Sequence, residues 1–132
     1  MILKLGDTFE QNFMISNDTH INFINTFQDR NPLHTSDNFA QTKGFESKVM
    51  HGNILNGFLS YFIGECLPTK NVIIHTQSIQ FKNAVYMDDN LLFSAEVIGT
   101  YESVNAVEFK FNFKNSNNKI AAKGEIQIGI LL

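Results

Sequence analysis

Residues 52–67 read GNILNGFLSYFIGECL, which is the only long apolar helix pattern in this 132-residue chain. The apolar side chains recur every three to four residues and cover more than half of a helical circumference, as expected of a helix buried in a core. Pro68 ends the pattern. Gly57 and Gly64 weaken a helix, so we expect another backbone to approach it closely at these positions.

After Pro68 the hydrophobic period changes from near four to two, which indicates strands. The alternation predicts four of them, over residues 71–82, 91–97, 107–113 and 120–130. Turn residues at 87–90, 102–103 and 115–118 separate them. We expect the four strands to follow one another as an antiparallel meander.

The residues ahead of the buried helix are more varied. Residues 1–15 are expected to form a strand or extended arm, and Ser16 or Asp18 caps a helix that runs to about Gln28. The apolar stripe of this helix is Ile21, Ile24 and Phe27, with Phe23 beside it, and we expect His20 to be solvated in its first turn. The whole chain, 1–132, is therefore predicted to be a single α+β domain in which an antiparallel sheet wraps one buried helix.

Composition excludes several function classes. The formal net charge is −3 and no basic run is present, so we expect no nucleic-acid partner. No apolar stretch reaches eighteen residues, and the single cysteine, Cys66, fits a reducing compartment, so we expect a cytoplasmic protein that does not enter a membrane. Charged residues make up only 17%, which predicts an apolar surface covered by a partner subunit.

The first candidate site is the run Asp29-Arg30-Asn31-Pro32-Leu33-His34. Pro32 stops the preceding helix, so residues 29–35 are predicted to be a loop. A carboxylate and an imidazole on one constrained loop can hold a water between them, and the Asn31 amide can orient the carboxylate. The same run also fits plain turn chemistry, in which Asp29 only caps a turn.

The second candidate is His51-Gly52, at the start of the buried helix. Backbone N–H groups are unpaired there and the helix dipole favours negative charge. A glycine would let a substrate carbonyl reach the Gly52 N–H, as in an oxyanion hole, although Gly52 also suits a tight turn. We expect His51 to hold the turn by hydrogen bonds. Ser60 could hydrogen-bond within the site or to a carbonyl of its own helix.

The remaining reactive side chains carry no motif. His75 reads as an ordinary strand residue and Cys66 as a core residue. The histidines and the cysteine lack metal-ligand spacing, and neither a glycine-rich phosphate loop nor a serine nucleophile elbow is present. We therefore expect no metal site.

Together these residues resemble the MaoC-like hydratases, the (R)-specific enoyl-CoA hydratases of the hotdog fold. The resemblance covers nearly the whole chain in the right order. It rests on residues 29–34, Phe39-Ala40, Gly44-Phe45, residues 49–52, Ser60, Gln80-Phe81-Lys82, Val85 and Asp88-Asp89.

The resemblance implies a long helix wrapped by a curved sheet, with an overhanging segment that carries the catalytic pair. It implies that Asp29 and His34 activate a water that adds reversibly to a trans-2-enoyl thioester, linked to CoA or to an acyl carrier protein. The Gly52 N–H is expected to bind the thioester carbonyl, with Asn31, Ser60 and His51 in support. It also implies a homodimer or a dimer of dimers, and no cofactor or metal.

Two other functions are consistent with the same fold. A hotdog thioesterase would release free thiol from the same ligands, and a non-catalytic acyl-thioester binding module would bind them without turnover. The Asp-x-Asn-Pro-x-His run argues against the thioesterase, and an intact acid–base pair argues against the binding module.

Overall fold

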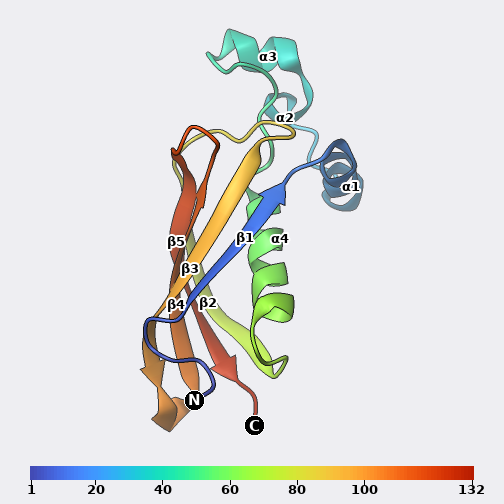
Figure 1. The fold of residues 1–132 in the computed structure, drawn as a ribbon. Helices are drawn as coiled ribbons and strands as arrows, with labels where there is room; N and C mark the ends of the chain where they lie inside the picture. The colour runs from blue at the N-terminus through green and yellow to red at the C-terminus, as the bar shows by residue number, and fades with distance from the viewer.

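A computed structural model describes residues 1–132 as one antiparallel sheet wrapped around a central helix, with three short helices gathered beyond one end of it (Figure 1). This confirms the α+β architecture expected from the sequence. In chain order the elements are β1 (Thr8–Met14), α1 (Asn17–Phe27), α2 (Pro32–Thr35), α3 (Asp37–Thr42), α4 (Asn53–Tyr61), η1 (Phe62–Cys66), β2 (Val72–Phe81), β3 (Asn90–Tyr101), η2 (Glu102–Val104), β4 (Ala106–Lys114) and β5 (Ile120–Ile130).

The sheet has the strand order β1-β3-β4-β5-β2. Strands β3, β4 and β5 form the expected meander, but β2 does not pair with β3; it pairs with β5 at the far edge, which corrects the prediction of four consecutive neighbours. The connection after β2 makes its hydrogen bonds elsewhere. The N–H groups of Lys82 and Asn83 donate to the Ala121 carbonyl, and the Val85 carbonyl accepts from Met50. A connection paired in this way cannot fold back as a hairpin.

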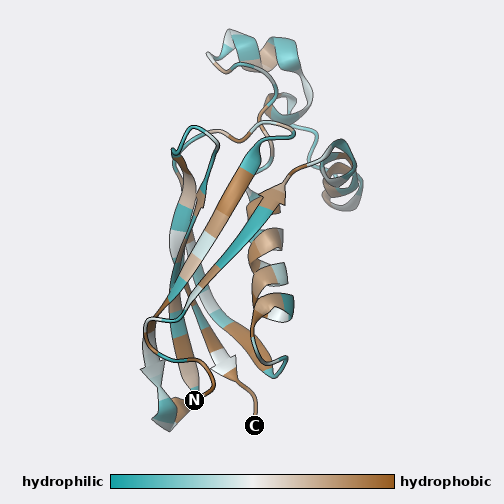
Figure 2. Cartoon of the chain, in the orientation of Figure 1, coloured by the Kyte–Doolittle hydropathy of each residue, from teal (hydrophilic) through white to brown (hydrophobic).

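The core lies between α4–η1 and the inner face of the sheet. Figure 2 shows the central helix as mostly hydrophobic along its length. Phe62, where the α-helix becomes a π-helical turn, is fully buried and packs its ring 4.8 Å from Phe93 and 5.7 Å from Phe109, measured between centroids. The helix therefore spans residues 53–66 nearly as predicted, but its last turn is π-helical.

The two glycines of the central helix do not mark a close approach. A Cβ built on Gly57 or Gly64 meets no atom within 4 Å, so the expected tight contact is absent from this chain. Both positions are exposed. Their weak helix propensity is not offset by packing within the chain.

The apolar stripe predicted for α1 is largely exposed. The only buried residue of this helix is His20. Phe27 is 67% exposed and Ile21 is 44% exposed, whereas His20 is only 3% exposed. The expectation of a solvated His20 is therefore wrong. α1 lies beside the first turns of the central helix, where His20 and Phe23 meet the imidazole of His51 and Phe23 also packs against the core.

Residues 29–35 are not entirely a loop. Pro32 begins the single helical turn α2, because its fixed φ suits the first helical position and its missing N–H is unpaired there in any helix. The Asn31 side-chain oxygen caps this turn by accepting from the Leu33 N–H at 2.9 Å. The next helix, α3, is capped by Ser36, whose side-chain oxygen accepts from the Phe39 N–H.

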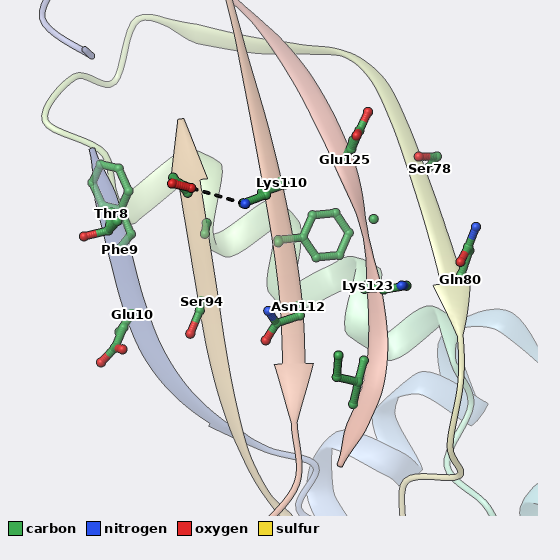
Figure 3. Close-up of a pocket in the computed structure, with 15 residues that line it drawn as sticks. Thr8, Phe9, Glu10, Ser78, Gln80, Ser94, Lys110, Asn112, Lys123 and Glu125 are labelled. Carbon is green, nitrogen blue, oxygen red and sulfur yellow. Dashed lines mark ion pairs between the residues drawn. The ribbon is translucent and has the colours of Figure 1, made fainter. Parts of the chain in front are cut away.

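The outer face of the sheet is polar and forms the largest hollow, about 980 Å³ in volume. Figure 3 shows its side chains projecting from all five strands, with Lys110 paired to Glu96 at 3.4 Å. None of the candidate site residues lines this hollow. Separately, none of the helices has the length and apolar character needed to cross a membrane.

Candidate active site

The Asp29 loop is shaped by short hydrogen bonds. Gln28 ends α1 in the left-handed conformation, with φ of 63°, and turns the chain toward Asp29. The Asp29 carboxylate then accepts from the backbone N–H of Asn31 at 3.1 Å. Asn31 thus meets the carboxylate through its main chain, whereas its side-chain oxygen caps α2. The amide contact expected from the sequence is not the one observed.

His34 is held by the segment that leads into the central helix. Its Nδ1 lies 2.7 Å from the Val49 carbonyl oxygen, and the Val49 N–H donates to the Leu33 carbonyl. A carbonyl can only accept, so Nδ1 carries the hydrogen and Nε2 has a bare lone pair when the ring is neutral. The half-buried imidazole is therefore oriented as a base.

His51 connects the Asp29 loop to the start of α4. Its Nε2 donates to the Asp29 carbonyl oxygen at 3.0 Å and lies 3.9 Å from the Asp29 carboxylate. The carboxylate oxygen of Asp29 and a ring nitrogen of each of His34 and His51 all lie within 4.8 Å of one another. The acid and the imidazole predicted to converge at the amino end of the buried helix do so.

Burial controls the charge of the histidines behind this pair. Desolvation lowers the pKa of His51, with the neighbouring His34 adding to the effect, while the carbonyl and carboxylate of Asp29 oppose it. Desolvation likewise lowers the pKa of His20, and the nearby His51, Lys48 and His34 lower it further. Both rings are therefore neutral at neutral pH.

The three ligand-type side chains are close enough together to face one metal ion, but two features of their geometry disfavour it. The rings of His34 and His51 are stacked, with centroids 4.1 Å apart and planes 27° apart. Ring-nitrogen lone pairs lie in the ring plane, so stacked imidazoles present them side by side. Nε2 of His51 also already donates to a carbonyl. The geometry suits proton transfer better than metal coordination.

Gly52 lies at the junction of the site. It caps α4, and its N–H makes no hydrogen bond within the chain. A Cβ at this position would lie 2.7 Å from the Phe81 ring, so any larger residue would have to displace that ring. Beside it is a hollow of about 350 Å³, lined by Gly52, His34 and Phe81 among mainly apolar residues.

A second hollow opens on the other side of the site. Its volume is about 440 Å³, and Asp29, Asn53, Phe23 and Phe27 contribute to its walls. Asn53, the first residue of α4, lines both hollows, so they lie next to each other. An extended ligand could pass from one to the other across the Asp29 carboxylate, the His34 ring and the Gly52 N–H.

Ser60 is not brought into this cluster. It is eight residues after Gly52, about 12 Å along the helix axis. Its side chain is exposed and makes no hydrogen bond in the single chain.

Sequence reasoning missed His20, and gave Phe81 no role at the site. His20 could have been found from spacing: positions 20, 23, 24 and 27 follow the i, i+3, i+4, i+7 pattern of one helical face. Phe81 could not, because only the fold brings the end of β2 onto Gly52.

Comparison with known proteins fits this geometry. The model of the MaoC like domain matches residues 5–118. The chain belongs to the MaoC-like hydratase/dehydratase family. The resemblance inferred from the sequence is thereby confirmed, and the hotdog fold with it.

Several relatives are similar over most of this chain. The (R)-specific enoyl-CoA hydratase of Aeromonas caviae is 32% identical over 98 residues, which is 74% of this chain and 73% of the relative. The mitochondrial 3-hydroxyacyl-[acyl-carrier-protein] dehydratase of Arabidopsis thaliana is 28% identical over 127 residues, 94% of this chain and 75% of the relative. Among solved structures, the (R)-hydratase of A. caviae involved in PHA biosynthesis superposes with a TM-score of 0.89 at 26% identity, covering 97% of both chains.

Proposed function

We propose that this MaoC-like protein is an (R)-specific enoyl-thioester hydratase that also dehydrates (R)-3-hydroxyacyl thioesters. One observation carries the proposal: the Asp29 carboxylate and the His34 imidazole approach within 4.8 Å of each other beside the free N–H of Gly52. Hydration of a conjugated thioester needs a base for water, a proton for the α-carbon and a donor for the carbonyl oxygen. The cluster offers all three.

In the proposed mechanism Asp29 and His34 hold one water between them. The bare Nε2 of His34 accepts a proton as the water oxygen bonds to C3 of the enoyl group, and the Asp29 carboxylate orients the water by accepting its other hydrogen. The His34 imidazolium keeps its Nδ1–H bond to the Val49 carbonyl. The proton taken from water is then delivered to C2, so addition consumes one water and needs no other reactant.

Negative charge develops on the thioester oxygen during the addition. The Gly52 N–H at the amino end of α4 is the proposed donor to this oxygen, because it has no partner in the chain and the helix dipole favours an anion there. His51 supports the site by holding the Asp29 carbonyl, and Asn31 by donating its backbone N–H to the Asp29 carboxylate.

The proposed substrates are enoyl thioesters of CoA or of an acyl carrier protein. Two relatives support this choice by name, one a hydratase of enoyl-CoA and the other a dehydratase of a carrier-protein thioester. The two hollows that share Asn53 would receive the acyl and thiol-side arms of the substrate.

We further propose that the chain works as a homodimer or a dimer of dimers. β2 is an edge strand with unpaired backbone groups, and it exposes Ile73, Ile74 and Phe81. Open apolar edges are normally covered in native proteins. A second copy would cover this edge and could bring Ser60 of the exposed α4 face against substrate, since nothing in the single chain engages it.

The decisive experiment follows two products in one assay. The purified protein is mixed with trans-2-enoyl-CoAs of graded length and with a carrier-linked enoyl substrate, while enoyl absorbance and free thiol are recorded together. We expect enoyl absorbance to fall without thiol release and an (R)-3-hydroxyacyl product to form. Thiol release would favour a thioesterase, and binding without either change would favour a non-catalytic module; both would refute the proposal.

A further inference from the structure

The His34 ring of the acid–base pair is the first of three imidazoles packed in a column, with two more histidines behind it. His51 lies in the middle, with its ring centroid 4.1 Å from that of His34 on one side and 5.5 Å from that of His20 on the other. Phe23, one turn along α1 from His20, packs its ring 4.6 Å from His51. The column therefore runs from α1 through His51, two residues before α4, to α2.

Two nitrogens of this column are buried without a partner. Nε2 of His51 donates to the Asp29 carbonyl, so Nδ1 of the neutral ring is a bare acceptor, and no donor meets it. Nδ1 of His20 also lacks a hydrogen-bond partner, and it is buried because only 3% of His20 is exposed. A leucine would fill the space behind His51 without the cost of burying an unpaired polar nitrogen. Buried polar groups without partners are expected mainly at functional sites.

The surroundings of His20 oppose a positive charge. Its ring faces the imidazoles of His51 and His34 and the ammonium of Lys48, and only the His34 backbone carbonyl favours protonation. His51 faces His34, His20 and Asp29, of which Asp29 alone favours a charge. A proton on either ring would place positive charge on or beside His51, which holds the Asp29 carbonyl. This charge would draw the Asp29 carboxylate toward His51 Nε2, now 3.9 Å away.

We infer that His20 is a positioning residue: its neutral ring packs behind His51 and keeps the His51 hydrogen bond to the Asp29 carbonyl in place, so that the carboxylate stays directed at the water. This role rests on the proposed hydratase function. In this role the His20 side chain contacts neither the substrate nor the water directly. Its consequence is that protonation of His20 or His51 should lower activity, although neither ring holds the water.

The test replaces His20 with Leu, which keeps apolar bulk, and with Gln, which keeps a polar group; neither can titrate. We expect kcat to fall by roughly tenfold in both, because small displacements of catalytic groups are costly, with KM nearly unchanged. The acid side of the kcat–pH profile should move to lower pH. Asn25→Leu, at an exposed position of α1 outside the site and away from β2, is the matched control and should match the wild type.

A purely structural role gives a different result. If both His20 variants keep the wild-type kcat and pH profile, or lose activity only in proportion to the fraction unfolded in a denaturation curve, the inference is wrong. NMR titration of the wild-type histidine rings tests it without catalysis: His20 and His51 should each titrate below the ordinary histidine pKa, and the neutral His51 ring should carry its proton on Nε2. An ordinary or raised pKa at either ring would overturn the inference even if the protein proves not to be a hydratase.

Discussion

At the scale of single residues, the site depends on which nitrogen of each histidine carries a proton. The Val49 carbonyl fixes the Nδ1–H form of His34, and the Asp29 carbonyl fixes the Nε2–H form of His51. Two imidazoles in one cluster are thus given opposite tautomers by two backbone acceptors. His34 is left with its lone pair toward the site, whereas His51 is left with a buried lone pair behind it.

Stability should fall as pH falls, because of His20 and His51. Burial lowers the pKa of both rings in the folded protein, so the unfolded chain binds more protons than the folded one below the ordinary histidine pKa of 6.5. The free energy of unfolding should be highest above pH 6.5 and decrease steadily as the pH falls below it. Urea denaturation at pH 7.5, 6.5 and 5.5 measures this. In His20→Leu the dependence should be weaker, and an unchanged dependence would contradict the assignment.

Gly52 serves two purposes that a pair of variants can separate. In Gly52→Ala the new methyl group would meet the Phe81 ring at 2.7 Å, so we expect lower stability and a turnover reduced on the order of tenfold as the N–H shifts. Adding Phe81→Leu should restore the melting temperature by making room. It should not restore turnover, because the methyl group still crowds the proposed carbonyl position. Full recovery of turnover in the double variant would show that Gly52 is required only for packing.

Among individual residues, Asp29, His34 and Gly52 could be predicted to converge because their chemistry and spacing are carried by local sequence. The burial of His20 could not be read from its polarity. A histidine near a helix start is usually solvated, and only the tertiary contact with His51 makes this one different. The Asn31 contact was misassigned because its backbone N–H took the role expected of its amide.

At the scale of elements, periodicity predicted the helices and strands well, and pairing poorly. The alternation in β4 and β5 is regular because one face of each strand is buried. The local sequence does not show that the segment after β2 makes hydrogen bonds to β5 and to residue 50. These hydrogen bonds carry the chain across to β3. Likewise, Pro32 signals a break in helix equally well whether the next turn is a loop or a new helix.

The central helix should tolerate, and gain from, one substitution. Gly57 is exposed in α4 and a Cβ there meets nothing within 4 Å. Gly57→Ala should therefore raise the free energy of unfolding of the isolated chain by about 0.5–1 kcal/mol, from helix propensity alone. Chemical denaturation at a protein concentration low enough to keep the chain monomeric measures this. A loss of stability under those conditions would contradict the open space that the structure shows around Gly57.

At the scale of the whole molecule, the apolar side chains left exposed have a pattern. Ile73, Ile74 and Phe81 lie on the edge strand β2, and Ile21 and Phe27 lie on α1. Low charge content had predicted an apolar surface, and composition could not say where it would be. The fold places part of it along one sheet edge and beside the candidate site, and the rest is spread over other parts of the chain.

Oligomeric state follows from this edge. The wild type is expected to sediment at twice the chain mass of 15.0 kDa or at a multiple of that. Ile73→Lys, which places a charge on the half-exposed edge of β2, should shift the distribution toward the monomer and reduce turnover in parallel. Asn117→Lys, in the exposed turn between β4 and β5, is the control. A wild type that is monomeric and fully active at assay concentration would rule out the proposed homodimer.

The most direct measurement compares the hydration rate of an enoyl-CoA by the wild type with the rates of Asp29→Asn, His34→Asn and the double variant. Each single change should lower kcat by about 10²–10⁴-fold with an unchanged melting temperature. The kcat of the double variant should be only slightly below that of the less active single variant, because both groups act on one water. Near wild-type hydration by either single variant would contradict the assignment of this site.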